Sequence, residues 1–371
     1  MRITFVLPPV NLSGGVRVVA IHAKALAQKG HQVCLVSPPH QPISTSNKIK
    51  SLLKGNGWPP NLGTHPSHLD GSGLEHRVLD TCRPVSNDDV PDGDVVIATW
   101  WETAEWVAAL SPRKGAKVYF IQHHEVFDYL PVDRVRATWR LPLQKITISK
   151  WLLDLAKSEY GDDSVELVPN GVDIDQFYAP QRGRQARPVV GLLYSTEQWK
   201  GVDVSLSAIE RARDHLPELH LIAFGAVPVS KQLPLPENSR FHHRPDQQRL
   251  RELYASCDVW LCGSYSEGFH LPPLEAMACR CPVVSTGVGG SIDVIEHGHN
   301  GYIVPIGDSE ALAARLIDVL TKEDMDWRKM SDAALATAQR NDWSNSVNRM
   351  EAALETCSVR APRCETLGCG V

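Results

Sequence analysis

The sequence predicts an α/β protein with two doubly wound, parallel-sheet domains. Three observations favour this class. The chain has 371 residues, which is too long for one ordinary domain. An apolar run, a polar loop, an amphipathic helix pattern and a second apolar run occur in this order near residue 3 and again near residue 188. A Pro- and Gly-rich stretch at 171–187 separates the two halves and predicts a linker.

The first half opens with "MRITFVLPP", in which residues 3–7 read as a buried strand. A glycine loop at Gly14 and Gly15 follows, and then a helix pattern that ends at Lys29-Gly30, a typical C-cap. The next apolar run, "QVCLVS", predicts a second strand. A helix between two apolar runs forms a βαβ unit, so the sheet is expected to be parallel with helices on both faces.

Ligands of doubly wound sheets bind at the carboxyl ends of the strands, so a cleft between the two domains is the expected site. Residues 41–75, rich in Ser, Asn, Gly, His and Pro, read as a long surface loop. The predicted division is an N-terminal Rossmann-like domain at 1–172, a linker at 173–187, a C-terminal Rossmann-like domain at 188–340, a helix at 341–357 and a disordered tail at 358–371.

Composition narrows the class of function. A net charge of -5 argues against a general nucleic-acid binder. The nine cysteines have neither metal-ligand spacing nor a C-x-x-C pair, which favours a reduced, cytoplasmic setting. No apolar run reaches the ~18 residues of a membrane-spanning helix, and the apolar N-terminus lacks a cleavage site, so it reads as a strand.

The stretch "SEGFHLPPLEAMA" at 266–278 holds two glutamates on either side of a helix start. The proline pair favours the first helical turn, and the N–H groups from Gly268 to Leu271 are expected at its positive end, an anion site suited to a diphosphate. Glu275 is placed in that first turn, where it could bind a ribose, and Glu267 could bind hexose hydroxyls. The helix dipole alone would also favour Glu275, and Glu267 could be an ordinary loop residue.

This block resembles the E-x7-E signature of retaining glycosyltransferases of family 4 (GT4), which have the GT-B fold of two Rossmann-like domains. The flanking segments "SGG", "VPNGVD", "WKGVD" and "GVGGSIDVIEHGHNGYIVP" resemble other segments of the family, so the likeness extends over almost the whole chain before the tail. The residues that match the signature are Glu267, Gly268, Phe269, Leu271, Pro272, Pro273, Glu275, Ala276, Met277 and Ala278.

The resemblance implies a role for each part of the site. The C-terminal domain would bind the nucleotide sugar, with Glu275 on the ribose, Glu267 on the sugar and Lys200 on the leaving phosphate. Lys200 and Glu267 are therefore candidate catalytic residues; read alone, Lys200 could be a solvated surface lysine. The implied donor-binding residues are Gly14, Gly15, Lys200, Glu267, Gly268, Phe269, His270, Leu271 and Glu275.

The sequence departs from the family pattern at the phosphate. Members commonly carry an arginine shortly before the lysine, but "GLLYSTEQWKG" has none before Lys200. Either another cation, such as Arg17 or Arg244, or the hydroxyls of Tyr194 and Ser195 would replace it.

Two further positions differ from the family. His270 stands where a small residue is usual, so the contacts with the donor sugar could differ. Asp293 stands where the family usually has glutamate.

The N-terminal domain would bind the acceptor. An apolar strand ends in His123, His124 and Glu125, and polar residues at the carboxyl end of a strand face the expected cleft. The family places a histidine near the donor sugar and the acceptor, so His123 is a third catalytic candidate. A histidine bonded only to backbone is the alternative, and a metal site is not expected because no third ligand has suitable spacing. The pattern "QHHE…FDYLP…ITISKWL" looks loosely like the rhamnosyltransferase branch.

The predicted function is transfer of a sugar from a nucleoside diphosphate to a hydroxyl of a glycan, a lipid-linked molecule or a small molecule, with retention and with neither metal nor cofactor. The segment at 134–157 is rich in basic residues. It could contact a membrane surface peripherally, or it could be an ordinary solvated helix face. A sugar-nucleotide epimerase, a phosphorylase or a sugar-binding module without turnover are the alternatives. The nucleotide base, the sugar, the acceptor and the oligomeric state are not indicated.

Overall fold

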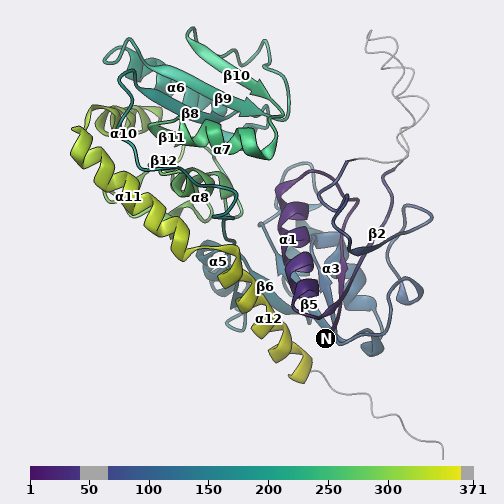
Figure 1. The fold of residues 1–371 in the computed structure, drawn as a ribbon. Helices are drawn as coiled ribbons and strands as arrows, with labels where there is room; N and C mark the ends of the chain where they lie inside the picture. Colours follow the sequence, from purple (N-terminus) through teal and green to yellow (C-terminus); the bar gives the residue numbers. More distant parts are fainter. Residues whose placement is uncertain (42–65, 361–371) are drawn as a thin grey trace, which may run out of the picture. The chain divides into compact units, whose positions relative to one another are not determined.

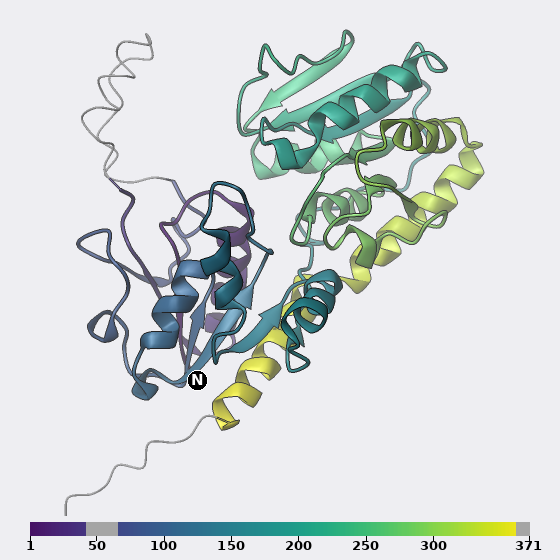
Figure 2. The same cartoon turned by 180° about the vertical axis from the view of Figure 1, so that it is seen from behind.

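The computed structural model describes residues 1–41 and 66–360, in two compact units (Figures 1 and 2). Unit 1 comprises Met1–Thr147, Ala156–Glu166 and the chain from Val347, and unit 2 comprises Ile148–Leu155 and Leu167–Ser346. The units therefore interleave along the sequence, unlike the contiguous domains expected. Most of the expected 41–75 loop and the tail from 361 lie outside the described residues.

Unit 1 contains a seven-stranded sheet in the order β3-β2-β1-β4-β5-β6-β7. The pairings from β3 to β6 are parallel, with Thr4 opposite both Cys34 and Val96. The strands are β1 (Arg2–Val6), β2 (Gln32–Ser37), β3 (Glu75–Val78), β4 (Val95–Ala98), β5 (Ala116–Ile121), β6 (Gln144–Thr147) and β7 (Glu166–Leu167).

Helices connect strands of this sheet, and the first of these connections was predicted from the sequence. The first βαβ unit is confirmed: a helix joins β1 to β2 and ends before Lys29, and Gly30 takes the left-handed conformation (φ 93°) of a C-cap glycine. The helical elements of this part of the chain are α1 (Gly14–Gln28), η1 (Asn87–Asp89), α3 (Trp101–Ala109), η2 (Pro112–Lys114), α4 (Val132–Thr138) and α5 (Lys150–Tyr160).

Unit 2 contains a six-stranded sheet in the order β10-β9-β8-β11-β12-β13, and all of these pairings are parallel. The unit 2 sheet and the first six strands of the unit 1 sheet thus have the 3-2-1-4-5-6 order of a Rossmann fold. The strands are β8 (Val189–Leu193), β9 (His220–Gly225), β10 (Ser239–His243), β11 (Val259–Cys262), β12 (Val283–Thr286) and β13 (Gly301–Val304).

Helices α6 and α10 pack against each other, and α8 packs against α7 and α11 (Figure 1). Leu192 of β8, Leu206 of α6 and Leu316 of α10 are buried in one apolar core, and each such side chain contributes about 1.5–3 kcal/mol. The helical elements from residue 198 onward are η3 (Gln198–Lys200), α6 (Val202–Arg213), α7 (Gln247–Ala255), α8 (Leu271–Ala278), α9 (Ser291–Val294), α10 (Ser309–Thr321), α11 (Asp324–Arg340) and α12 (Trp343–Arg360), the last of which continues into unit 1.

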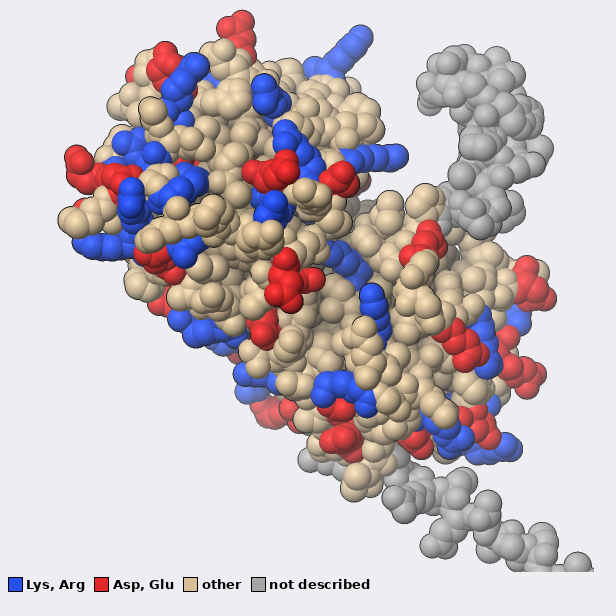
Figure 3. All heavy atoms as spheres, in the orientation of Figure 1, with Lys and Arg blue, Asp and Glu red and all other residues tan. Residues whose placement is uncertain are grey.

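Helix α12 differs from the predicted helix at 341–357. It continues to Arg360, so the first residues of the predicted tail are helical. Among the residues described, no helix combines the length and the apolar character that crossing a bilayer requires. On the face drawn in Figure 3, basic and acidic side chains are interspersed.

Candidate active site

The E-x7-E block connects the carboxyl end of β11 to α8, which packs against β11 and β12 (Figure 1). The helix begins at Leu271, so the proline pair does lie in its first turn, as predicted. The placement of Glu275 in the same turn is wrong. Glu275 is the fifth helical residue and lies in the second turn, because His270 and not a later residue caps the helix.

Lys200 and Glu267 form the ion pair at the centre of this loop. The Lys200 Nζ lies 2.9 Å from both carboxylate oxygens of Glu267, and the Ser264 hydroxyl donates to Oε1 at 2.8 Å. The Glu267 side chain is 9% exposed and that of Lys200 is 26% exposed. A carboxylate and an ammonium, both with limited contact with solvent, are therefore held together.

Close packing of two turns positions Lys200. Gly201 has φ 51°, and a Cβ there would lie 1.9 Å from the carbonyl oxygen of Gly263 at the end of β11. The Tyr265 N–H donates to the Trp199 carbonyl at 2.8 Å. Only glycine fits this contact, so the "WKG" sequence brings the β8–α6 turn onto the β11–α8 loop.

The charge state of Glu267 depends on this pair. Burial alone would raise its pKa, but a charge interaction with the protonated form of His270, the charge of Lys200 and the hydrogen bonds from Lys200 and Ser264 lower it below the usual value. Burial lowers the pKa of His270 to about 4, so this imidazole is neutral near pH 7. We therefore attribute the ionised state of Glu267 mainly to Lys200 and Ser264.

The glycine loop after β12 packs against the Glu267 loop. A Cβ on Gly289 would lie 2.8 Å from the Glu267 carbonyl oxygen, and one on Gly290 would lie 2.7 Å from the Phe269 ring. Phe269 is 3% exposed, so its side chain belongs to the core. Of the predicted donor-binding residues, Phe269 could offer a ligand its backbone but not its ring.

The start of α5 belongs to unit 2 and also supports this loop. The Ser149 hydroxyl and the Trp151 indole N–H both donate to the Gly268 carbonyl, at 3.1 and 2.7 Å. The Lys150 N–H donates to Asp293 at 2.8 Å. Sequence reasoning missed Ser149 and Trp151 as parts of the site, although both lie in the "ITISKWL" segment that resembles the family.

Glu275 is buried and is held by a residue from the neighbouring helix. The Tyr254 hydroxyl of α7 donates to Glu275 Oε2 at 2.9 Å. Burial, followed by the nearby Glu275 charge, raises the pKa of Tyr254 well above its usual value, so the phenol stays protonated. The α7 sequence gave no signal for this contact, because Tyr254 could equally have been a core aromatic residue.

One proposed substitute for the missing arginine has other partners. The Tyr194 hydroxyl donates to the Leu233 carbonyl at 2.8 Å and accepts from the Ser230 N–H at 2.9 Å. A phosphate would have to break these bonds to reach it. Arg244, after β10, donates from Nε to the Ala226 carbonyl at 2.9 Å.

In unit 1 the three predicted acceptor-binding residues after β5 have separate partners. His123 bonds through Nδ1 to the His124 carbonyl at 2.9 Å, and His124 Nε2 lies 2.8 Å from the Tyr160 hydroxyl. Glu125 is 3% exposed and accepts from the Trp101 N–H at the start of α3, at 3.1 Å. Glu125 therefore binds a helix terminus, which is a structural role that the sequence did not indicate.

Gly14 and Gly15 do not form the expected loop, because they are the first two residues of α1. The Gln122 side chain donates to the Gly15 carbonyl at 3.2 Å. This contact links the start of α1 to the carboxyl end of β5, the edge of the unit 1 sheet that also carries His123.

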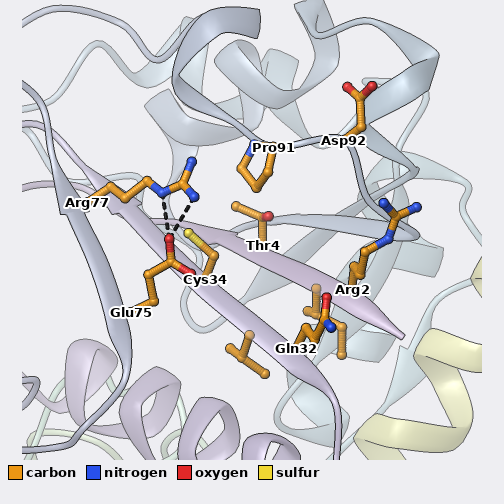
Figure 4. A pocket seen from close by; sticks show the side chains of 10 residues that line it. Arg2, Thr4, Gln32, Cys34, Glu75, Arg77, Pro91 and Asp92 are labelled. Atoms are coloured by element: carbon orange, nitrogen blue, oxygen red, sulfur yellow. Dashed lines mark hydrogen bonds and ion pairs between the residues drawn. The ribbon is translucent and has the colours of Figure 1, made fainter.

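A cavity of about 360 Å³ lies in unit 1 at the other edge of the sheet, near the amino ends of β1, β2 and β3 (Figure 4). Its charged groups already have partners: Arg77 pairs with Glu75 at 2.6 Å, and Asp92 pairs with Arg113 at 2.6 Å. None of the predicted site residues lines it.

Two family models match consecutive parts of the chain. The model described as "Glycosyltransferase Family 4" matches residues 12–176, and the model described as "Glycosyl transferases group 1" matches residues 176–336. Together they extend over both units and include Lys200, Glu267 and Glu275.

Two related mannosyltransferases support the same family. The phosphatidyl-myo-inositol mannosyltransferase of Mycobacterium leprae is 30% identical over 54% of this chain and 55% of its own length, so the alignment spans about half of that relative. The enzyme of the same name from Mycobacterium tuberculosis is 29% identical over 96% of this chain and 97% of its own length.

Solved structures with a similar fold cover nearly the whole chain. The HepE protein of Anabaena, solved in complex with UDP, has a TM-score of 0.73 and 18% identity, and the match covers 96% of this chain and 100% of that one. Sucrose-phosphate synthase from Thermosynechococcus elongatus has a TM-score of 0.69 and 17% identity, and the match covers 96% of this chain and 99% of that one. The fold is GT-B, and the chain belongs to glycosyltransferase family 4.

Proposed function

We propose that the enzyme moves a sugar from a nucleoside diphosphate to an acceptor hydroxyl, with retention at the anomeric carbon and with neither a metal ion nor a cofactor. The observation that carries this proposal is the Lys200–Glu267 pair in the loop before α8. An ammonium suits a diphosphate, and a carboxylate suits the hydroxyls of a sugar. The pair thus supplies one group for each half of a nucleotide sugar.

In the proposed reaction the bond between the anomeric carbon and the β-phosphate oxygen breaks, and a bond to the acceptor oxygen forms on the same face. The acceptor proton passes to the leaving phosphate. Lys200 stabilises the charge that develops on that phosphate. Glu267 accepts hydrogen bonds from the sugar, and its charge favours the positive character that develops on the sugar ring.

The comparisons support a nucleotide-sugar donor, because the HepE structures contain UDP or UDP-glucose. For the acceptor we propose a hydroxyl of a glycan, a lipid-linked molecule or a small molecule. His123 is the proposed group nearest the reacting hydroxyl, and His124 lies beside it in sequence. The ring of His124 is half-buried and bonds through Nε2 to the Tyr160 hydroxyl, which favours a supporting role for this second histidine.

The test is a panel of nucleotide sugars, including UDP-glucose and GDP-mannose, assayed for nucleotide release with the purified full-length chain. Lys200→Ala should lower kcat by roughly 10²–10³-fold, because the charge on the leaving phosphate loses its cation. Excess EDTA should leave the rate unchanged, and NMR of the product should show the donor's anomeric configuration.

Lys329→Ala is the matched control, because this lysine of α11 is 68% exposed and pairs with Asp326 in the preceding helical turn, away from the candidate site. It should have the wild-type rate. Turnover that is equal in both lysine variants, an inverted product or a requirement for a divalent cation would each contradict a stated part of the proposal.

A further inference from the structure

His270 has an unusual backbone conformation at the amino end of α8. It lies in the left-handed region, with φ 76° and ψ 75°. For a residue with a side chain this conformation costs about 1–2 kcal/mol, and glycine adopts it freely. Strained residues persist where their surroundings hold them, and they gather at functional sites. The contacts of the imidazole are therefore informative.

The imidazole lies between a serine and the catalytic carboxylate. Its Nδ1 is 2.9 Å from the hydroxyl of Ser291, the first residue of α9, and its Nε2 is 3.7 Å from Glu267 Oε1. The second distance is too long for a hydrogen bond. The side chain of His270 is 4% exposed, so its orientation is fixed by packing and not by solvent.

Lys200 holds Glu267 in the structure, but the proposed function gives Lys200 a second partner. When Lys200 turns to a diphosphate, Glu267 loses two hydrogen bonds and its cation and keeps the Ser264 hydroxyl. A buried carboxylate without its partner is costly. The His270 Nε2 lies less than 1 Å beyond hydrogen-bond reach of the same oxygen that faces Ser264.

We propose that His270 is a positioning residue that takes over the Glu267 carboxylate when Lys200 binds the donor phosphate. In this arrangement the Ser291 hydroxyl donates to Nδ1, which places the ring proton on Nε2, and Nε2–H donates to Glu267. The carboxylate then stays ionised and oriented toward the sugar. The inference rests on the proposed function, because it requires Lys200 to leave Glu267.

One test needs no knowledge of the donor. Two charged groups face His270, namely Glu267 on its own loop and Lys200 on η3, while Ser291 on α9 is polar. In Lys200→Ala, the freed carboxylate should raise the pKa of His270 by at least one unit from its value of about 4. The measurement is ¹⁵N NMR of the histidine ring between pH 3 and 8.

The matched control is the double variant Lys200→Ala with Glu267→Gln, which lacks the carboxylate. In this double variant most of the rise in the His270 pKa should be absent. An unchanged His270 pKa in Lys200→Ala, or an equal rise in the double variant, would overturn the inference. This result is independent of turnover: if no nucleotide sugar reacts but the pKa rises, the proposed function fails and the coupling stands.

The second test uses the kinetics. His270→Gly should lower kcat for transfer about tenfold and leave the Kd of UDP or GDP within twofold, because the nucleotide does not use Glu267. His270→Asn, which tolerates the left-handed region and keeps an amide donor, should recover part of the rate. The double variant with Glu267→Gln should be no slower than Glu267→Gln alone. Full activity of His270→Gly, or additive losses, would contradict the inference.

Discussion

At the residue scale, Glu125 shows how burial changes a carboxyl group. It is almost fully buried, and its pKa is raised well above the usual value by that burial, opposed only in part by the Trp101 N–H. The folded protein therefore keeps this group protonated to a higher pH than the unfolded chain does. In the unfolded chain the same group ionises with a pKa of roughly 4.3.

Glu125→Gln should consequently change the pH dependence of stability. The folded pKa is raised, so wild-type stability falls as pH rises above the unfolded pKa, and the neutral amide removes this fall. The difference in stability between variant and wild type should be smallest near pH 4, and the variant should gain stability relative to wild type as pH rises above the unfolded pKa. Urea unfolding at pH 4, 6 and 8 measures this, with Glu166→Gln on the exposed β7 as control. A variant that loses relative stability as pH rises would contradict the prediction.

At the element scale, the β8–α6 turn is the feature that makes the site. Lys200 reaches Glu267 because Gly201 allows its turn to lie against the backbone at Gly263. The two elements come from separate parts of the chain, and the contact between them is backbone to backbone. It is therefore insensitive to most side-chain changes but very sensitive to an added Cβ.

Gly201→Ala should destabilise unit 2 by more than ~2 kcal/mol and separate Lys200 from Glu267, because the left-handed φ and the clash add together. Gly161→Ala is the control. Gly161 has a similar φ of 66°, but a Cβ there meets nothing within 4 Å, so it should cost only about 1 kcal/mol and leave turnover unchanged. Thermal melts and kcat distinguish the two, and equal effects would contradict the clash.

Many of the helices and strands could be predicted from the sequence. The βαβ units followed from apolar runs and the Lys29-Gly30 cap, since both signals are local. The helix α8 starts at Leu271, one residue before the predicted proline pair, and this moves Glu275 from the first turn to the second. The difference was not predictable, because a left-handed histidine cap has no sequence signature. The contacts of Tyr254 and Ser149 were missed because they depend on tertiary packing between distant segments.

At the scale of the whole molecule, helix α12 starts in unit 2 and belongs to unit 1 from Val347. Glu351 attaches it to the end of α1, since its carboxylate lies 2.6 Å from Lys29 Nζ and 2.7 Å from His31 Nε2. Hydrogen bonds from these two residues, first Lys29 and then His31, lower the pKa of Glu351. The attachment is thus fully present above the unfolded pKa and is lost as pH falls.

Glu351→Gln should lower the stability of unit 1 by about 1 kcal/mol at pH 7, in line with partly exposed ion pairs. The difference should shrink as pH falls through the carboxyl range. Calorimetry of the full chain checks this, because two units can unfold in separate transitions and only that of unit 1 should move. Glu355→Gln, one turn further along α12, should behave as wild type. An equal shift in both variants would contradict the prediction.

The interleaving of the two units restricts how the chain can be divided. Residues 148–155 belong to unit 2 although unit 1 segments flank them on both sides, and the last described residues return to unit 1. A single cut in the linker would give one fragment with a foreign helical turn and without its closing helix, and another fragment with the opposite defects. Attempts to express either half alone, or to exchange halves between relatives, must therefore transplant these two segments as well.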